Sequence, residues 1–223
     1  MPRSDRPMTP ILYAHPFSSY SQKVLVALYE NATPFEYLHL DQDGHMDALA
    51  ARWPLRRFPL LVEGERTVIE ASTIIEYLQV HHPGPWAAIP AEPDAALDVR
   101  MLDRFFDNYV STPQQKVVFD SLRPEADRDR VGVADAMAML ETAYAWLDQR
   151  MATRTWAAAE RFSLADCGAA PFLFYAHVTC PIPPRHRHLL AYRARLLERP
   201  SVARAVDEAR PYRPLFPLGE IVD

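Results

Sequence analysis

The sequence predicts two domains: a small α/β domain of βαβ–ββα order, followed by an all-helical domain. Short apolar runs alternate with a helical pattern over the first part of the chain. A proline-rich stretch, "PGPWAAIPAEP" at 83–93, then interrupts that pattern and indicates a stiff connection. Beyond it, apolar residues recur at helical spacing. We therefore place the first domain at 8–83, a linker at 84–94 and the helical domain at 95–223.

The first three elements form a strand–helix–strand unit. Residues Ile11 to Ala14 are a short apolar run near prolines, which predicts a buried strand. Val24, Leu25 and Leu28 follow at helical spacing and predict a helix. The segment "PFEYLHL", 34–40, alternates and predicts a second strand. The helix of such a unit should form a right-handed crossover between its two strands, and we expect these strands to be parallel.

A hairpin and a helix complete the first domain. Residues 41–54 are mixed and predict one or two helical turns. In "FPLLVEGERTVIE", two apolar runs flank Glu63–Glu65, which has glycine at its centre and predicts an antiparallel hairpin. A helix is expected over 71–82, with three apolar residues on one face: Ile74, Ile75 and Leu78. This order of elements is that of a thioredoxin-like domain.

Periodic apolar stripes predict the helices of the second domain. The first stripe is Leu97, Met101, Leu102, Phe105, Phe106, Tyr109 and Val110; the second is Val133, Met137, Leu140, Tyr144, Leu147 and Met151. The segment 162–178 is apolar nearly all round, as a central buried helix should be. Its start, Ser163-x-x-Asp166, has the spacing of a capping box. A last helix is predicted by Val202, Ala205, Val206 and Ala209.

Composition restricts the classes of function. The 223 residues are 49% hydrophobic and 24% charged, which is ordinary for a globular protein. The net charge is −5, and the basic stretch from Arg185 to Arg199 is interleaved with Leu and Tyr, as on a solvated helix face, so we expect no nucleic-acid partner. No run approaches the ~18 apolar residues of a membrane span, and the N-terminus has no apolar signal region. We expect a cytoplasmic protein without a metal site, whose Cys167 and Cys180 are free thiols.

Three motifs carry a resemblance. They are "LYAHPFSSYSQKVLVALYE", "RRFPLLVEGERTVIEASTIIEYL" and "RFSLADCGAAPFLFYA", in this order. Through them nearly the whole chain resembles the cytosolic glutathione transferases, with the N-terminal motif of the serine-type members of the bacterial, tau or zeta kind. The resemblance implies the glutathione transferase fold and a homodimer. It also implies glutathione as co-substrate and a small hydrophobic electrophile as its partner.

By this resemblance Ser18 is the catalytic residue, whose hydroxyl donates a hydrogen bond to the glutathione sulfur. A thiol of pKa about 8.5 needs ~2 kcal/mol to be half ionised at neutral pH. A helix N-terminus contributes about 0.3–1 kcal/mol and a hydrogen bond to a charged acceptor roughly 1.5–3 kcal/mol, so together they suffice. We expect Ser19 and Ser21 only to cap the helix. Because a serine forms no mixed disulfide, thiol-transferase chemistry is disfavoured.

The second motif supplies the residues that the resemblance assigns to glutathione. A cis bond is implied at Phe58-Pro59, which would direct the Phe58 backbone at the cysteinyl part of the ligand. Glu70 fits the ligand ammonium. Ala71 keeps a backbone N–H for the ligand carboxylate, but the family usually has serine there. Ser72 lies one position after this place, so its hydroxyl need not replace that of the usual serine.

Two further parts of the site are expected from the resemblance. Arg57 is preferred over Arg56 and His45 as the partner of the glycyl carboxylate. Met101, Phe105 and Tyr109 are candidate walls of a second-substrate pocket between the domains, although an aromatic stripe at helical spacing is more often core. The C-terminal segment 212–223 is a candidate cover for this cleft.

Other functions on the same fold stay open. "SSYS" is similar to the serine pair of zeta-type maleylacetoacetate isomerases, but Tyr20 stands where those proteins have cysteine. An isomerase, lyase or dehalogenase is therefore an alternative. A non-enzymatic alternative is a regulatory or binding protein, such as the bacterial stringent starvation protein that binds RNA polymerase. Ala71 favours this alternative, whereas Ser18, Pro59 and Glu70 oppose it.

Overall fold

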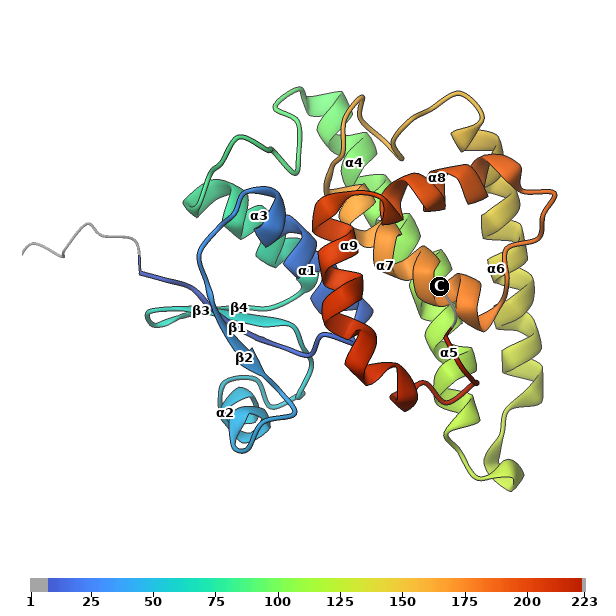
Figure 1. Ribbon diagram of the computed structural model, residues 1–223, viewed down its shortest axis with the longest axis horizontal. Coiled ribbons are helices and arrows are strands. Elements are labelled where there is room, and N and C mark those ends of the chain that lie inside the picture. Colours follow the sequence, from blue (N-terminus) through green and yellow to red (C-terminus); the bar gives the residue numbers. More distant parts are fainter. Residues whose placement is uncertain (1–7, 222–223) are drawn as a thin grey trace, which may run out of the picture.

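A four-stranded mixed sheet forms the first domain in this computed structural model, which describes residues 8–221 (Figure 1). The strands are β1 (Ile11–Ala14), β2 (Glu36–His39), β3 (Leu60–Glu63) and β4 (Arg66–Val68), in the spatial order β2-β1-β3-β4. β1 runs parallel to β2 and antiparallel to β3, and β3 and β4 form the antiparallel hairpin. This arrangement confirms the βαβ–ββα order predicted from the sequence.

Three helices cover this sheet: α1 (Ser19–Glu30), α2 (His45–Arg52) and α3 (Ala71–His81). Side chains alternate along β1, as the period of two requires. Leu12 and Ala14 join the cluster formed with α1 and α3, whereas Tyr13 joins a second cluster with Leu49 of α2. The sheet therefore has α1 and α3 on one face and α2 on the other.

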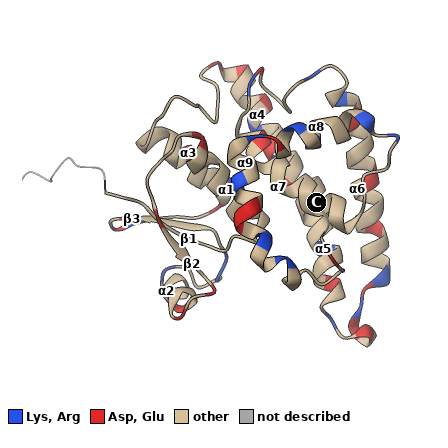
Figure 2. Cartoon of the chain, viewed as in Figure 1, with Lys and Arg blue, Asp and Glu red and all other residues tan. Residues whose placement is uncertain are grey.

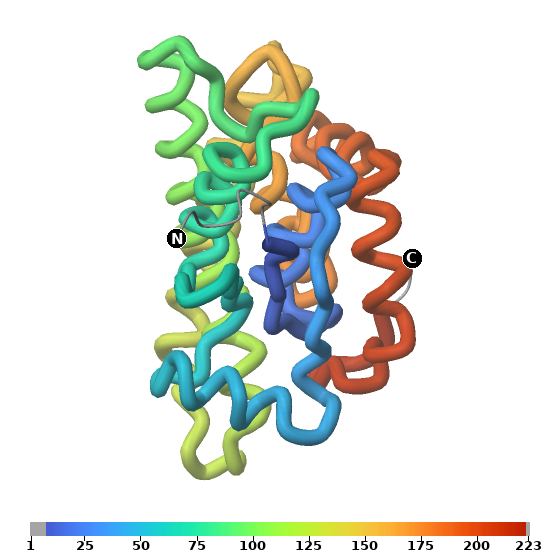
Figure 3. Tube along the Cα trace, turned by 90° about the vertical axis from the view of Figure 1, so that its left-hand side faces the viewer, coloured from blue at the N-terminus to red at the C-terminus, as the bar shows by residue number. Residues whose placement is uncertain are grey.

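The second domain contains six α-helices among the described residues: α4 (Pro93–Phe105), α5 (Thr112–Ser121), α6 (Arg130–Met151), α7 (Leu164–Thr179), α8 (Arg187–Leu197) and α9 (Pro200–Ala209). Short helices η1 (Phe106–Ser111), η2 (Glu125–Asp127) and η3 (Arg210–Leu215) connect or extend them. α7 is central and almost free of charged residues (Figure 2), and the predicted capping box of Ser163 and Asp166 is present at its start. In the turned view, α9 lies beside α1 (Figure 3).

The helix predicted over 97–110 is divided in the structure. α4 ends at Phe105, η1 is a π-helical turn, and α5 begins at Thr112. Pro113 is the physical reason, because a proline has no N–H to donate to the residue four positions earlier and clashes with its carbonyl. A wider turn accommodates this, and Thr112 Oγ1 donates a hydrogen bond of 2.9 Å to the Asp107 carbonyl.

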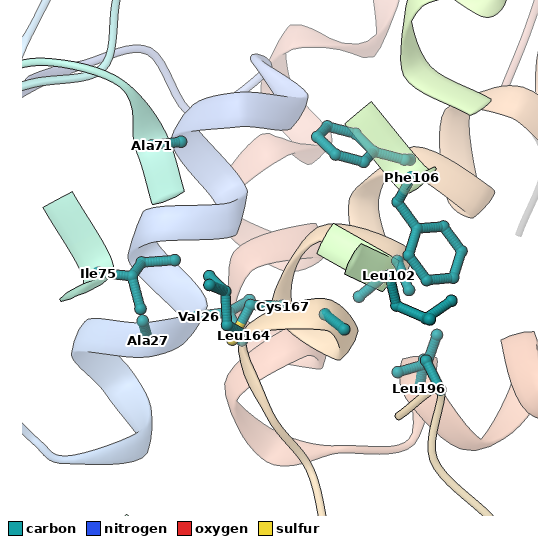
Figure 4. Close-up of a cluster of buried hydrophobic side chains, with 14 of the residues drawn as sticks. Val26, Ala27, Ala71, Ile75, Leu102, Phe106, Leu164, Cys167 and Leu196 are labelled. Atoms are coloured by element: carbon teal, nitrogen blue, oxygen red, sulfur yellow. The ribbon is translucent and has the colours of Figure 1, made fainter. Parts of the chain in front are cut away.

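The two domains share one hydrophobic core (Figure 4). Val26 of α1, Ile75 of α3, Leu102 of α4 and Cys167 of α7 belong to the same cluster, and all are at most 1% exposed. Cys167 and Cys180 are free thiols. A search of residues 8–221 finds no helix that is long and apolar enough to span a membrane. Because the core is continuous, a site between the domains has rigid walls on both sides.

Candidate active site

One cavity between the domains gathers residues that are far apart in the sequence. Its volume is about 360 Å³. All six residues that the sequence assigned to catalysis and to glutathione line it: Ser18, Arg57, Phe58, Pro59, Glu70 and Ala71. They come from the start of α1, the loop before β3 and the start of α3. The cavity is therefore built around two helix N-termini, where unpaired backbone N–H groups favour anionic ligand groups.

Ser18 is the N-cap of α1, and its side chain is half-buried at the cavity wall. Its Oγ accepts a hydrogen bond of 3.3 Å from the Ser21 backbone N–H. A hydroxyl that accepts one hydrogen bond still has a proton to donate, so capping and catalysis are compatible at this residue. The capping role expected of Ser19 and Ser21 is wrong, because Ser18 performs it. Ser21 is buried and accepts from the His15 N–H at 3.3 Å.

α3 begins at the opposite wall. Glu70 precedes it with φ of +67°, a positive value that is uncommon for a residue with a side chain and that often marks a functional site. Ala71 is the first residue of the helix and lines the cavity. Ser72 does not line it: its Oγ instead donates a hydrogen bond of 2.7 Å to Asp103. Ser72 therefore does not replace the serine that the family usually has at position 71.

The peptide bond between Phe58 and Pro59 is cis, as the resemblance implied. Pro59 is buried and Phe58 half-buried. Within the described residues, the backbone N–H and C=O of Phe58 have no hydrogen-bond partner. A backbone donor and acceptor pair left free at a cavity wall is suited to pairing with an extended peptide.

The three basic candidates differ in their surroundings. Arg56 and Arg57 are exposed, and both line the cavity. The Arg56 guanidinium lies 3.6 Å from Asp47, whereas Arg57 has no ion pair or hydrogen bond in the described part of the chain. His45 is outside the cavity, and its Nδ1 lies 2.7 Å from the His39 carbonyl oxygen.

The sequence did not predict four residues that line the cavity. Tyr20 and Trp53 come from the thioredoxin-like domain, and Gln115 and Phe119 come from α5 of the helical domain. Burial raises the pKa of Tyr20, so its hydroxyl stays protonated at neutral pH. Tyr20 was within reach of sequence reasoning, since it lies two residues after Ser18. Gln115 and Phe119 were not, because their direction depends on the π-helical turn before α5.

The structure places the three expected second-substrate residues away from this cavity. Phe105 and Tyr109 line a separate apolar groove of about 510 Å³ with residues of α6, and the Phe105 ring stacks on Trp146 at 4.5 Å. Met101 lines neither cavity and is 51% exposed. The reason is the rotation of the helix about its axis. Asp103 and Asp107 occupy the side that faces α1, so Met101, Phe105 and Tyr109 lie on other sides.

A buried charge cluster lies behind the cavity. Lys23 Nζ is 2.6 Å from Asp103 Oδ1 and 2.9 Å from Asp107 Oδ1, and Arg104 pairs with both carboxylates from the solvent side. Burial by itself would raise the pKa of Asp103, but the Lys23 charge and the hydrogen bonds it accepts hold that pKa below its usual value. Burial raises the pKa of Asp107 despite the same lysine.

The C-terminal segment covers a different place from the one expected. Phe216 and Ile221 are buried against Phe174 and Tyr175 of α7, in a cluster that also includes Phe17. No described residue of this segment lines the cavity, and residues 222–223 lie outside the described residues. Within residues 8–221, no group of three or more His, Cys, Asp or Glu side chains could hold a metal ion.

Known proteins resemble this chain in sequence and in fold. The chain is 24% identical over 201 residues to the "Stringent starvation protein A homolog" of Coxiella burnetii, covering 89% of this chain and 91% of the relative. It is 24% identical over 196 residues to "Glutathione S-transferase GstB" of Escherichia coli K12, covering 85% and 93%. A crystal structure of a glutathione S-transferase from Methylobacterium radiotolerans, in complex with glutathione sulfonate, superposes with a TM-score of 0.77 at 25% identity, covering 97% and 98%.

Two family models match the chain. The N-terminal domain of glutathione S-transferase matches residues 12–86, and the C-terminal domain of glutathione S-transferase matches residues 125–195. Together these matches span well over half of the chain and fall on the two structural domains. The chain therefore belongs to the glutathione S-transferase family.

Proposed function

We propose that the protein is a glutathione transferase in which Ser18 stabilises the glutathione thiolate for attack on a small hydrophobic electrophile. The observation that carries this proposal is the single cavity lined by Ser18, Arg57, Phe58, Pro59, Glu70 and Ala71. The names of relatives support it, since one is a glutathione S-transferase and another was crystallised with glutathione sulfonate.

The residues of the cavity fit the groups of glutathione. Its thiol belongs beside Ser18, and its cysteinyl backbone beside the free N–H and C=O of Phe58. The Glu70 carboxylate suits the γ-glutamyl ammonium, and the N-terminus of α3 at Ala71 suits the γ-glutamyl carboxylate. Arg57, which lacks an ion-pair partner in the described residues, is the residue best placed for the glycyl carboxylate.

The chemistry follows from the hydroxyl and the helix. Bound glutathione releases its thiol proton to solvent, and the Ser18 hydroxyl, which keeps its own proton, donates a hydrogen bond to the resulting thiolate, so no histidine base is required. The positive end of α1 adds to the stabilisation of the negative sulfur. In a conjugation the sulfur electron pair forms a carbon–sulfur bond, and the electrophile releases its leaving group with the bonding pair.

The part of the cavity lined by Tyr20 of α1 and by Gln115 and Phe119 of α5 is the place for the electrophile. These three side chains combine two aromatic rings with two hydrogen-bonding groups. An apolar surface with a few polar groups is usual for small-molecule sites. Met101, Phe105 and Tyr109 do not line this part of the cavity.

A homodimer is the second component of the proposal. Leu97, Met101, Phe105 and Tyr109 form a stripe along α4 and η1, and Leu97 and Met101 are 66% and 51% exposed. Met139 and Trp146 extend this surface over α6. An apolar surface of this kind is rare on a monomer, and a second copy of the chain would cover it. We place the protein in the cytoplasm, where free thiols persist.

A regulatory protein on the same fold is the competing proposal. The relative named stringent starvation protein A homolog, together with alanine at position 71, favours it. Titration calorimetry with glutathione separates the two. We expect binding with a micromolar to millimolar Kd, and no heat at millimolar glutathione would instead favour the regulatory protein. With binding established, consumption of glutathione in a panel of electrophiles indicates conjugation, and its regeneration indicates an isomerase.

A further inference from the structure

The loop that carries Ser18 is held by two buried side chains from outside the loop. Gln22 of α1 is 2% exposed, and its Nε2 donates hydrogen bonds to the Pro16 carbonyl at 2.8 Å and to Tyr175 Oη at 3.1 Å. Tyr175 of α7 is 5% exposed, and its hydroxyl donates to the Phe17 carbonyl at 3.0 Å. Two consecutive carbonyls immediately before Ser18 are thus fixed by one connected network.

Apolar packing supports the same contact. The rings of Phe17 and Tyr175 meet edge to face, with centroids 5.4 Å apart. Phe216 and Ile221 are buried in the same cluster as Tyr175, and Phe17 packs against that cluster. Burial raises the pKa of Tyr175 above its usual value, so its hydroxyl remains a donor at neutral pH.

The network acts on the position of the Ser18 hydroxyl. The Ser18 N–H donates to the His15 carbonyl at 3.0 Å, so residues 15–18 form one turn whose outer carbonyls are those of Pro16 and Phe17. Neither Gln22 nor Tyr175 lines the cavity. Because a misplacement of about 1 Å at a reacting group can cost on the order of a hundredfold in rate, fixing this turn matters for the hydroxyl.

We propose that Tyr175 and Gln22 are positioning residues that hold the Ser18 hydroxyl at the glutathione sulfur, so that α7 of the helical domain sets the thiol acidity in the other domain. This inference rests on the proposed function of Ser18. Tyr175 does not line the cavity, so it does not contact the ligand. The loss of its hydroxyl should therefore change the ionisation of the bound thiol more than the affinity for glutathione.

The chain offers a matched control for the test. Tyr144 of α6 is also buried, and its hydroxyl also donates to a backbone carbonyl at 3.0 Å, that of Cys180. Tyr144 and Cys180 lie outside both the network and the cavity. Tyr175→Phe and Tyr144→Phe therefore remove the same kind of hydrogen bond, and each should lower the melting temperature by about 2–4 °C.

The decisive measurement is the pKa of bound glutathione thiol, from ultraviolet absorbance of the thiolate titrated against pH. Tyr175→Phe is expected to raise it by about 0.5–1 unit and Tyr144→Phe to leave it unchanged. At a pH low enough to keep the bound thiol protonated, the Kd for glutathione should change less than about twofold in both variants. Gln22→Met should also raise the pKa of the bound thiol. It tests the positioning role independently if Tyr175→Phe does not fold. Equal thiol pKa values in both tyrosine variants would overturn the inference.

Ser18→Ala in the same titration separates this inference from the proposed function. A raised thiol pKa in Ser18→Ala, with Tyr175→Phe and Gln22→Met identical to the parent, would overturn only the positioning role. An unchanged thiol pKa in Ser18→Ala would overturn both, because the network would then have no catalytic hydroxyl to position.

Discussion

Lys23 and Asp103 form a fully buried ion pair across the domain boundary. Their charged atoms are 2.6 Å apart, and their side chains are 0% and 2% exposed. Lys23 belongs to α1 and Asp103 to α4, so this pair joins the thioredoxin-like domain to the helical domain directly behind the candidate active site. A buried pair stabilises a protein little in comparison with apolar residues, but the removal of one partner leaves a charge without compensation.

Lys23→Met should therefore be strongly destabilising. Asp103 and Asp107 would both remain buried with only the partly exposed Arg104 as a cationic partner, and we expect the free energy of unfolding to fall by about 3 kcal/mol in a denaturant titration. Arg100→Met is the control, because Arg100 of α4 also forms an ion pair with the first domain. Its partner is Glu76 of α3, at 2.8 Å, and this pair is exposed to solvent. That variant should lose at most about 1 kcal/mol. Similar losses in the two variants would contradict a special role for the buried pair.

Ser18→Ala tests the catalytic hydroxyl. A hydrogen bond to a charged acceptor contributes roughly 1.5–3 kcal/mol, so kcat/KM should fall about ten- to a hundredfold. Because Ser18 also caps α1, the free energy of unfolding should fall by about 1 kcal/mol. Ser18→Thr keeps both hydroxyl and cap and should retain most activity. Ser19→Ala, outside the cavity, should change neither quantity, and equal losses in the two alanine variants would refute the assignment.

Arg57→Ala should weaken glutathione binding without changing the thiol pKa. An exposed charge contributes modestly, so we expect the Kd to increase roughly three- to tenfold. This difference between variant and parent should become smaller as salt is added, because salt screens the charge of Arg57. Arg56→Ala is the matched control, because the Arg56 guanidinium already lies 3.6 Å from Asp47. If calorimetry gives the larger increase in Kd for Arg56→Ala, then Arg56 and not Arg57 binds the glycyl carboxylate.

Met101→Glu should dissociate the proposed dimer. It places a charge in the middle of the stripe formed by Leu97, Met101, Phe105 and Tyr109, where a partner would have to bury it. Sedimentation of the parent should give a dimer and that of the variant a monomer. Leu215→Glu, at a residue 64% exposed on η3, should remain a dimer. A monomeric parent protein would remove the basis for this part of the proposal.

Glu63 provides a pH-dependent contribution to stability. Burial alone would raise its pKa, but hydrogen bonds from Tyr77 at 2.6 Å and His82 at 3.0 Å hold the pKa below its usual value. A carboxylate with a lowered folded pKa stabilises the protein above its unfolded pKa of about 4.5, and this stabilisation is lost as the pH falls through the folded pKa.

The comparison with Glu63→Gln measures this contribution. The variant should be less stable by about 1 kcal/mol at pH 7, and the difference should shrink as the pH falls below about 4.5, the ordinary pKa of a glutamate, as measured by urea unfolding at each pH. Glu65→Gln, at the exposed end of the same hairpin, should match the parent throughout. A difference that persists at the lowest pH would mean that packing, and not the charge of Glu63, is responsible.

Much of the fold could be predicted because its signals are local. The short apolar run from Ile11 to Ala14 and the runs on either side of Gly64 each predict a strand from its own residues, and the β3–β4 partners are also close in sequence. The three motifs likewise supplied the residue types at Ser18, Phe58-Pro59 and Glu70, and the structure brings all of them to one cavity.

The orientation of the helical domain was decided by the tertiary structure. The stripe from Leu97 to Tyr109 showed that a helix has an apolar side, but periodicity cannot distinguish a side that faces a ligand from one that faces α6 or a partner. The pairing of Asp103 and Asp107 with Lys23 sets that rotation, and Pro113 redirects Gln115 and Phe119 into the cavity. Residue order specifies each helix, whereas contacts between residues distant in sequence determine which face meets the active site.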